Sequence, residues 1–139
     1  MIALDTNVIS EFMRPRPDAR VLGWLDRQPM SSVWTTAVSV FEIRSGLLAM
    51  AAGQRRSALM VKFEQWLAGV VEHRVLSFDE AAAERAAKVS AERRSQGSPG
   101  ESRDTMIAGI VLANHATLAT RNVKHFEDIA KWVVNPWEA

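Results

Sequence analysis

Three acidic residues stand where the sequence pattern changes, and together they could hold a divalent metal ion. Asp5 follows the apolar run at 1–4, Glu42 lies early in the apolar segment at 37–48, and Asp104 follows a loop rich in Ser, Gly and Pro. In an open α/β fold, ligands bind in the crevice beyond the carboxyl ends of the strands, where such junctions gather. Carboxylates brought together there repel one another unless a cation such as Mg²⁺, which prefers oxygen ligands, neutralises them. The pattern therefore predicts a metal-dependent enzyme.

Each of these acids also has a local explanation. Asp5 or Thr6 is a normal N-cap for the helix that follows, because its side chain can accept hydrogen bonds from free backbone N–H groups. Ser39 to Glu42 matches a capping box, in which Glu42 would reach back to the Ser39 amide. Asp104 lies where a carboxylate favours the positive end of a helix dipole. Considered singly, each acid is better explained in this way.

Considered together, Glu42 and Asp104 lie on or near the apolar faces of their predicted helices, a position that capping does not require. Asp104 shares a helical face with the apolar stripe at 107–111. Glu42 lies close to an apolar face formed by Val38, Phe41 and Leu48. A buried carboxylate is costly unless it is paired or bound to metal. A polar amide, Asn122, also follows the predicted fourth strand, on the side of the sheet where Asp5 ends the first.

The segments that would position these residues alternate between short strands and helices. Strands are predicted at 1–4, 32–35, 74–78, 117–119 and 132–134. Helices are predicted at 7–13, 18–27 and 37–52, where Gly53 ends the third helix. A further helix follows Gly53 and runs to about residue 68, and others are predicted at 79–94, 102–115 and 123–126. Strands separated by helices favour βαβ units, a parallel sheet and right-handed crossovers. The expected fold class is therefore α/β.

Composition narrows the possible class of protein. The 139 residues fit one domain, and 47% hydrophobic content favours a globular chain. The chain has no cysteine, which excludes disulfides and a thiolate zinc site and fits a reducing cytoplasm. No apolar stretch is long enough for a membrane span, and no signal peptide is indicated, so we expect a cytoplasmic protein with no membrane partner. The net charge of +1 is no nucleic-acid signature by itself.

Several short motifs follow one another in a characteristic order and spacing. They are Leu4–Glu11, the helix stop Arg14-Pro15-Arg16-Pro17, Phe41–Gly46, Asp104–Ala108 and Leu118–Phe126. With these motifs the chain resembles PIN-domain ribonucleases, specifically the VapC-type toxins of bacterial toxin–antitoxin pairs and, within them, the FitB-like branch. The resemblance covers nearly the whole length. It implies a single PIN domain over 1–139, with a PIN-like three-layer fold in which helices flank a five-stranded parallel sheet.

The resemblance also implies a site. Position by position, Asp5, Glu42 and Asp104 match the family's three acidic places, which hold Mg²⁺, with Mn²⁺ able to substitute. Asn122 stands where members carry Asp or Asn, and His125 stands where many carry a further Asp, so this site is less negative than its most acidic relatives. Thr6 and Ser10 would orient the metal ligands, although helix capping explains them equally well. Contacts with the RNA backbone would come from exposed basic residues, namely Arg14, Arg16, Arg44, Arg121 and Lys124.

The partners implied by the resemblance are an RNA substrate and a small antitoxin protein that occludes the site, often by inserting an arginine among the carboxylates. A homodimer is expected, or a dimer of dimers with the antitoxin.

Three other possible functions stay open at this point. A catalytically weak PIN-like module would bind RNA or a partner without cleaving RNA, and Asn122 is compatible with it. A phosphoacceptor receiver domain would use Asp5 and Asp79 but needs paired acids after its first strand and Lys-Pro after its last, where this chain has Asp5-Thr6 and Asn135-Pro136. A haloacid-dehalogenase-type phosphatase could use Asp5 as its nucleophile but lacks the second Asp.

Overall fold

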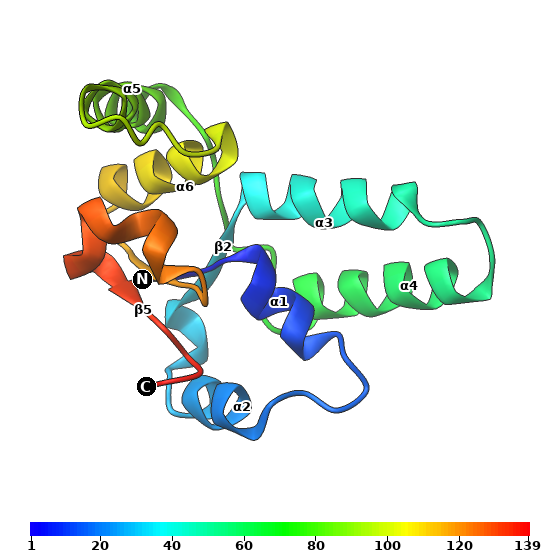
Figure 1. Cartoon of the computed structure of the whole chain (residues 1–139). Helices are drawn as coiled ribbons and strands as arrows, with labels where there is room; N and C mark the ends of the chain where they lie inside the picture. The colour runs from blue at the N-terminus through cyan, green and yellow to red at the C-terminus, as the bar shows by residue number, and fades with distance from the viewer.

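A five-stranded, all-parallel sheet forms the centre of the protein, as a computed structural model of residues 1–139 describes it (Figure 1). The strands lie in the order β3-β2-β1-β4-β5. Their bounds are β1 (Ile2–Leu4), β2 (Val33–Thr36), β3 (Val75–Leu76), β4 (Thr117–Ala119) and β5 (Val133–Val134). Leu4, the last residue of the central strand, pairs with Thr35 on one side and Ala119 on the other. A side chain directly after β1 therefore emerges between the ends of both neighbouring strands.

Helices cover both faces of the sheet and account for most of the chain. Six of them are α-helical: α1 (Thr6–Phe12), α2 (Ala19–Asp26), α3 (Ala37–Ala49), α4 (Gln54–Gly69), α5 (Glu80–Ser95) and α6 (Ser102–Ala113). Two 3₁₀ segments, η1 (Met30–Ser32) and η2 (Val123–Trp132), precede β2 and β5. In Figure 1, α3 and α4 lie side by side and project from the sheet, whereas α5 and α6 pack against each other on the other side of the sheet. No helix combines the length and the apolar character that crossing a bilayer requires.

Two apolar cores, one on each face of the sheet, hold the three layers together. Leu4 and Val33 belong to the core that α1 to α4 cover. Ala3 and Leu118 belong to the core beneath α5 and α6. Neighbouring residues of β1 enter different cores because successive side chains of a strand point to opposite faces. The predicted three-layer α/β fold with a five-stranded parallel sheet is confirmed.

The helices α5 and α6 approach each other very closely at Gly109. A Cβ atom added there would lie 2.6 Å from the Ala86 Cβ and 2.8 Å from the Ala86 backbone nitrogen. Small residues on both helices, Gly109 on α6 and Ala86 on α5, permit this contact.

Some predicted boundaries are wrong. The third helix ends at Ala49, because Met50 adopts an extended backbone, and Gly53 precedes α4 instead of ending α3. The helix predicted at 102–115 ends at Ala113, and His115 adopts a positive φ of 51°. The short turn predicted at 123–126 is the longer segment η2, which bends at Phe126. Phe126 and Ile129 interrupt this segment with non-helical backbone angles, and the side chains of both residues are buried.

Candidate metal centre

Asp5 lies at the carboxyl edge of the sheet, between the ends of β1 and β4. Its backbone N–H donates to the Ala119 carbonyl at 2.9 Å, and the residue is only 5% exposed. Oδ1 of Asp5 accepts a hydrogen bond from the Thr6 backbone N–H at 2.8 Å, so Asp5 is the N-cap of α1 as the local explanation proposed. Its other oxygen, Oδ2, accepts from the Thr120 hydroxyl at 2.7 Å. Capping therefore uses only one of the two carboxylate oxygens.

A hydrogen-bonded network fixes the orientation of Asp5. The Asn7 Nδ2 lies 3.3 Å from Asp5 Oδ2 and 3.2 Å from Thr120 Oγ1. Asn7 Oδ1 in turn accepts from the Arg121 backbone N–H at 3.0 Å, and Thr120 Oγ1 accepts from the Asn122 backbone N–H at 3.0 Å. These contacts tie the start of α1 to the end of β4. Sequence reasoning missed Thr120, whose signal is a hydroxyl directly after a buried strand.

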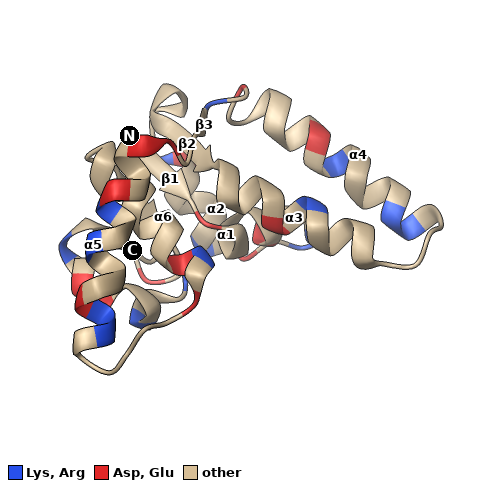
Figure 2. Ribbon diagram, turned by 90° about the horizontal axis from the view of Figure 1, so that it is seen from above, with Lys and Arg blue, Asp and Glu red and all other residues tan.

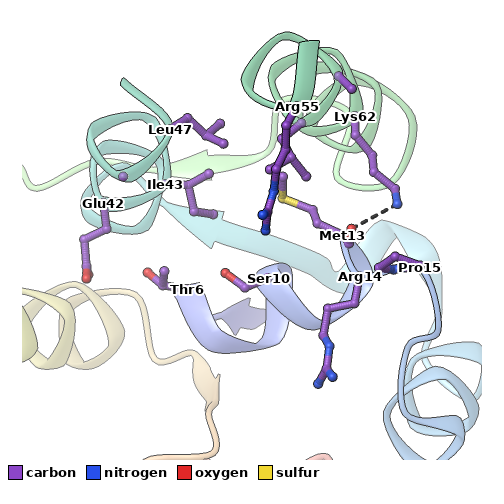
Figure 3. A pocket seen from close by; sticks show the side chains of 13 residues that line it. Thr6, Ser10, Met13, Arg14, Pro15, Glu42, Ile43, Leu47, Arg55 and Lys62 are labelled. Atoms are coloured by element: carbon purple, nitrogen blue, oxygen red, sulfur yellow. Dashed lines mark hydrogen bonds between the residues drawn. The ribbon is translucent and has the colours of Figure 1, made fainter. Parts of the chain in front are cut away.

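Glu42 approaches Asp5 from α3 and is not a capping residue. The cap of α3 is Thr36, whose hydroxyl accepts from the Ser39 backbone N–H at 3.1 Å, so the capping-box explanation is wrong. The Glu42 side chain is 22% exposed, and its Oε2 lies 3.6 Å from Nη1 of Arg103. The buried Thr6 hydroxyl faces Glu42 without completing a well-formed hydrogen bond (Figure 3).

The apolar face assigned to α3 is also wrong in part. Phe41 and Leu48 are exposed, and the buried side of the helix carries Val38, Ile43 and Leu47. Glu42 thus lies at the edge of the buried face, beside Ile43.

Asp104 approaches from the opposite side, in the first turn of α6. This position suits the helix dipole, as the local explanation proposed. Its side chain is mostly buried, and its Oδ2 lies 3.1 Å from Nδ1 of His125. The stripe at 107–111 on the same helix is buried, as expected. Asp104 therefore stands at the rim of the core that α6 helps to form.

The carboxylates are close enough that the charge of Asp104 affects the ionisation of Asp5 and Glu42. Burial raises the pKa of Asp5, and the negative charge of Asp104 raises it further, against hydrogen bonds from Thr120 and Thr6. Burial also raises the pKa of Glu42, and the charges of Asp5 and Asp104 add to this effect, while Arg103 opposes it. Burial raises the pKa of Asp104, and His125 opposes the increase. Three negative groups from distant parts of the chain thus share one edge of the sheet.

This donor set fits a hard divalent cation. Carboxylate oxygens are the ligands that Mg²⁺ takes in proteins, and a few are sufficient because the ion keeps several waters. No three acidic or histidine side chains converge as a ready-made set of ligands. Instead, each carboxylate contacts a partner from this chain: Thr120 for Asp5, Arg103 for Glu42 and His125 for Asp104. The buried Thr6 hydroxyl, which has no hydrogen-bond partner, faces the same space.

The remaining polar residues predicted for the site lie at different distances from these carboxylates. Asn122 stands at the start of η2, and its exposed side chain makes no hydrogen bond; only its backbone N–H reaches the Asp5 network, through Thr120. Ser10 lies one turn beyond Thr6 and makes no hydrogen bond to a carboxylate. Lys124 and His125 line a polar pocket together with Asp104.

The basic residues predicted to contact the RNA backbone also lie at different distances from the three carboxylates. Arg14 lines a groove that reaches Glu42 and lies 3.3 Å from Glu11 Oε1. Arg16 is exposed and makes no ion pair. Arg44 pairs with Glu64 on α4, and the Arg121 guanidinium lies 4.9 Å from the centre of the Trp137 ring. Only Arg14 and Lys124 therefore line a pocket that also contains one of the three carboxylates.

Arg93 is a residue that sequence reasoning missed. This buried arginine on α5 donates from Nε and Nη2 to the two carboxylate oxygens of Asp128, at 2.7 and 3.0 Å. It also donates to Thr105 Oγ1 and to the His125 carbonyl, each at 3.1 Å. Arg93 thereby holds η2, and His125 with it, against α6 beside Asp104. Nothing in the Ala-rich pattern of α5 distinguishes this arginine from its exposed neighbours.

A groove between α1, α3 and α4 ends at Thr6 and Glu42 (Figure 3). Its volume is about 650 Å³. Its lining combines apolar side chains with basic ones, namely Met13, Ile43, Leu47 and Leu59 with Arg14, Arg55 and Lys62. Lys62 Nζ donates to the Met13 carbonyl at 2.9 Å, which connects α4 to the end of α1. Figure 2 shows further Lys and Arg residues distributed over α4 and α5 with acidic residues among them.

Comparison with known proteins places these features in a family. The PIN-domain family model matches residues 2–131. The chain is 42% identical to the plasmid stability protein StbB of Pseudomonas syringae pv. tomato, over the whole length of both. It is 38% identical to the VapC ribonuclease Y4jK of Sinorhizobium fredii, with 99% of each chain covered. The crystal structure of FitAcB from Neisseria gonorrhoeae matches with a TM-score of 0.89 and 35% identity, covering 100% of both chains.

Proposed function

This chain belongs to the PIN-domain family, among the VapC and FitB toxins of toxin–antitoxin systems, and we propose that it is a metal-dependent endoribonuclease that hydrolyses RNA phosphodiester bonds. We further propose that residues 1–139 form a single PIN domain. Membership of the family removes the receiver-domain and phosphatase alternatives. The observation that supports the proposal is the position of Asp5 at the carboxyl edge of the sheet, near enough to Asp104 and Glu42 that the charges of Asp5 and Asp104 raise the pKa of Glu42. Such a cluster favours a divalent cation.

Asp5 and Asp104 would hold Mg²⁺ or Mn²⁺, directly or through water, and Glu42 would hold or orient the surrounding water. When bound, such an ion acidifies a water molecule for attack on phosphorus and neutralises charge on the phosphoryl oxygens. Thr120 and Asn7 fix the direction of the Asp5 carboxylate, which reduces the reorganisation required on binding. The exposed Asn122 amide could donate a hydrogen bond to the phosphate.

The proposed macromolecular partners are RNA and a small antitoxin protein. A relative 35% identical to this chain is named Toxin FitB, and the structure of FitAB bound to a DNA fragment matches the chain at 36% identity with a TM-score of 0.87. The groove between α1, α3 and α4 supports an antitoxin partner, because its apolar lining suits an amphipathic segment and its end at Glu42 would place that segment over the carboxylates. We also propose a homodimer, or a dimer of dimers with the antitoxin, in the cytoplasm.

The test of the proposed function is cleavage of RNA by the purified protein after removal of its antitoxin. We expect cleavage with Mg²⁺ or Mn²⁺ and none with EDTA. Asp104→Asn should abolish cleavage while the folding transition is preserved. Asp26→Asn, which makes the same change at the exposed end of α2, should leave the rate unchanged. RNA binding without cleavage in Mn²⁺ would instead indicate the catalytically weak module.

A further inference from the structure

Arg103 is the only residue that supplies a permanent positive charge directly to one of the three carboxylates. Its Nη1 lies 3.6 Å from Glu42 Oε2. The partner of Asp5 is a hydroxyl, and the partner of Asp104 is a histidine, which is charged only when protonated. A guanidinium stays charged at every accessible pH. Arg103 therefore neutralises part of the negative charge that a divalent cation would otherwise neutralise.

The contact between Arg103 and Glu42 also joins two separate elements. Arg103 precedes Asp104 in the first turn of α6, whereas Glu42 belongs to α3. This is the only ion pair between α6 and α3. Arg103 therefore links the helix that carries Asp104 to the side chain of Glu42.

Arg103 is free to exchange this partner, in contrast to the nearby Arg93. Arg93 is 6% exposed and makes four hydrogen bonds, which hold it in one position. The Arg103 side chain is 50% exposed, makes no hydrogen bond and is held only by the charge of Glu42. A pair with one half-exposed partner and a separation of 3.6 Å is weak, since water reaches the guanidinium and the long side chain loses freedom when it is held. A small change in the charge of Glu42 is therefore sufficient to release it.

We propose that Arg103 has two successive partners: it neutralises Glu42 in the metal-free protein and, once a divalent cation takes over that role, it contacts a phosphate of the bound RNA. This inference rests on the proposed function. The Arg103 guanidinium lies 3.6 Å from Glu42, one of the proposed ligands, so a phosphate bound beside the metal would lie within reach of this long side chain. Guanidinium groups bind phosphate through two parallel N–H donors, and these charge-assisted bonds are stronger than neutral ones. The released arginine would thus act as a substrate-binding residue.

Two partners imply two opposite effects of removing the guanidinium. In Arg103→Ala, the cation no longer competes with an internal positive charge, so Mn²⁺ should bind more tightly. The gain should be about three-fold, as expected for an exposed pair. The same variant lacks a contact with the phosphate, so kcat/KM for RNA at saturating Mn²⁺ should fall about ten-fold or more, as for the loss of a hydrogen bond to a charged group. A purely structural role would not change these two quantities in opposite directions.

The experiment compares three variants with the wild-type protein. Isothermal titration with Mn²⁺ alone measures metal affinity in the absence of RNA, and cleavage of a short RNA measures kcat/KM. Arg103→Lys keeps the charge but not the planar fork, so its Mn²⁺ affinity should be close to that of the wild type and its cleavage intermediate. Arg85→Ala removes an exposed arginine from α5, away from the site, and should change neither quantity.

The outcomes separate this inference from the proposed function. Mn²⁺ affinity that is unchanged or weaker in Arg103→Ala would overturn the first partner, and unchanged kcat/KM would overturn the second. If the wild-type protein does not cleave RNA, the proposed function and the second partner both fail, whereas the Mn²⁺ titration still decides the first. Tighter Mn²⁺ binding together with slower cleavage is the result that we expect.

Discussion

Replacing Arg93 with alanine should destabilise the protein strongly. Arg93 is buried and makes four hydrogen bonds, two of them to the carboxylate of Asp128. The substitution leaves the Thr105 hydroxyl, the His125 carbonyl and the Asp128 carboxylate without this donor. Breaking a buried pair by removing one partner costs about 3–5 kcal/mol. Asp128 is 29% exposed and can regain water, so we expect a loss near about 3 kcal/mol.

The loss should depend on pH, because Arg93 lowers the pKa of Asp128 through a hydrogen bond and its charge. A carboxyl whose pKa is lower in the folded protein adds stability above its unfolded pKa. That stability disappears as the pH falls through the folded value. The difference between wild type and Arg93→Ala should therefore shrink in acid. At neutral pH it should be fully present.

Urea denaturation of wild type, Arg93→Ala, Asp128→Ala and the double variant measures both the loss and the coupling energy. Arg93→Lys keeps a positive charge but cannot make the two parallel contacts, so it should recover only part of the stability. A neutral-pH loss below about 1 kcal/mol, the range of exposed pairs, would refute the reasoning. So would a coupling energy near zero in the double-mutant cycle.

Three further predictions follow from the packing and the charges. Gly109→Ala should destabilise the protein by about 1–3 kcal/mol in urea denaturation, because the new Cβ would lie 2.6 Å from the Ala86 Cβ. The control Gly46→Ala, where an added Cβ has nothing within 4 Å, should stabilise the protein by about 0.5–1 kcal/mol. Equal effects of the two substitutions would contradict the close contact between α5 and α6. Burial and the charge of Asp5 raise the pKa of Glu42 in the folded state, so the stability that Glu42 contributes is present below its unfolded pKa and is lost as the pH rises through the folded value. Metal-free Glu42→Gln should therefore be more stable than the wild type at neutral pH in urea denaturation, and this advantage should vanish in acid. Mn²⁺ at about 100 times its Kd should stabilise the wild-type protein by about 2.7 kcal/mol in thermal denaturation, and EDTA should reverse this stabilisation. If Mn²⁺ stabilises Asp5→Asn by the same amount, Asp5 is not a ligand.

The sequence was sufficient for the fold because strands and helices alternate clearly along it. The position of Asp5 followed from the same alternation, since a residue directly after a buried parallel strand lies at the carboxyl edge of the sheet. The orientation of α3 did not follow, because apolar residues surround that helix and periodicity cannot select the side that faces the core. The exposed Phe41 was therefore assigned to the wrong face.

The partners of the carboxylates were also beyond the reach of sequence patterns. Arg103 and Glu42 are distant in the chain, and their contact depends on how α6 lies against α3. The role of Arg93 depends likewise on the path of η2, whose kink at Phe126 carries no clear sequence signal. Local patterns determine the elements, whereas contacts between elements depend on packing that a single sequence does not display.

A crystal structure of the protein with Mn²⁺, recorded at a wavelength where manganese scatters anomalously, tests most directly whether Asp5, Glu42 and Asp104 share one divalent ion. We expect an anomalous peak at the carboxyl edge of the sheet, about 2.1 Å from carboxylate oxygens of Asp5 and Asp104, with Glu42 bound directly or through water. A peak held by other residues, or no peak at saturating Mn²⁺, would contradict the shared metal site.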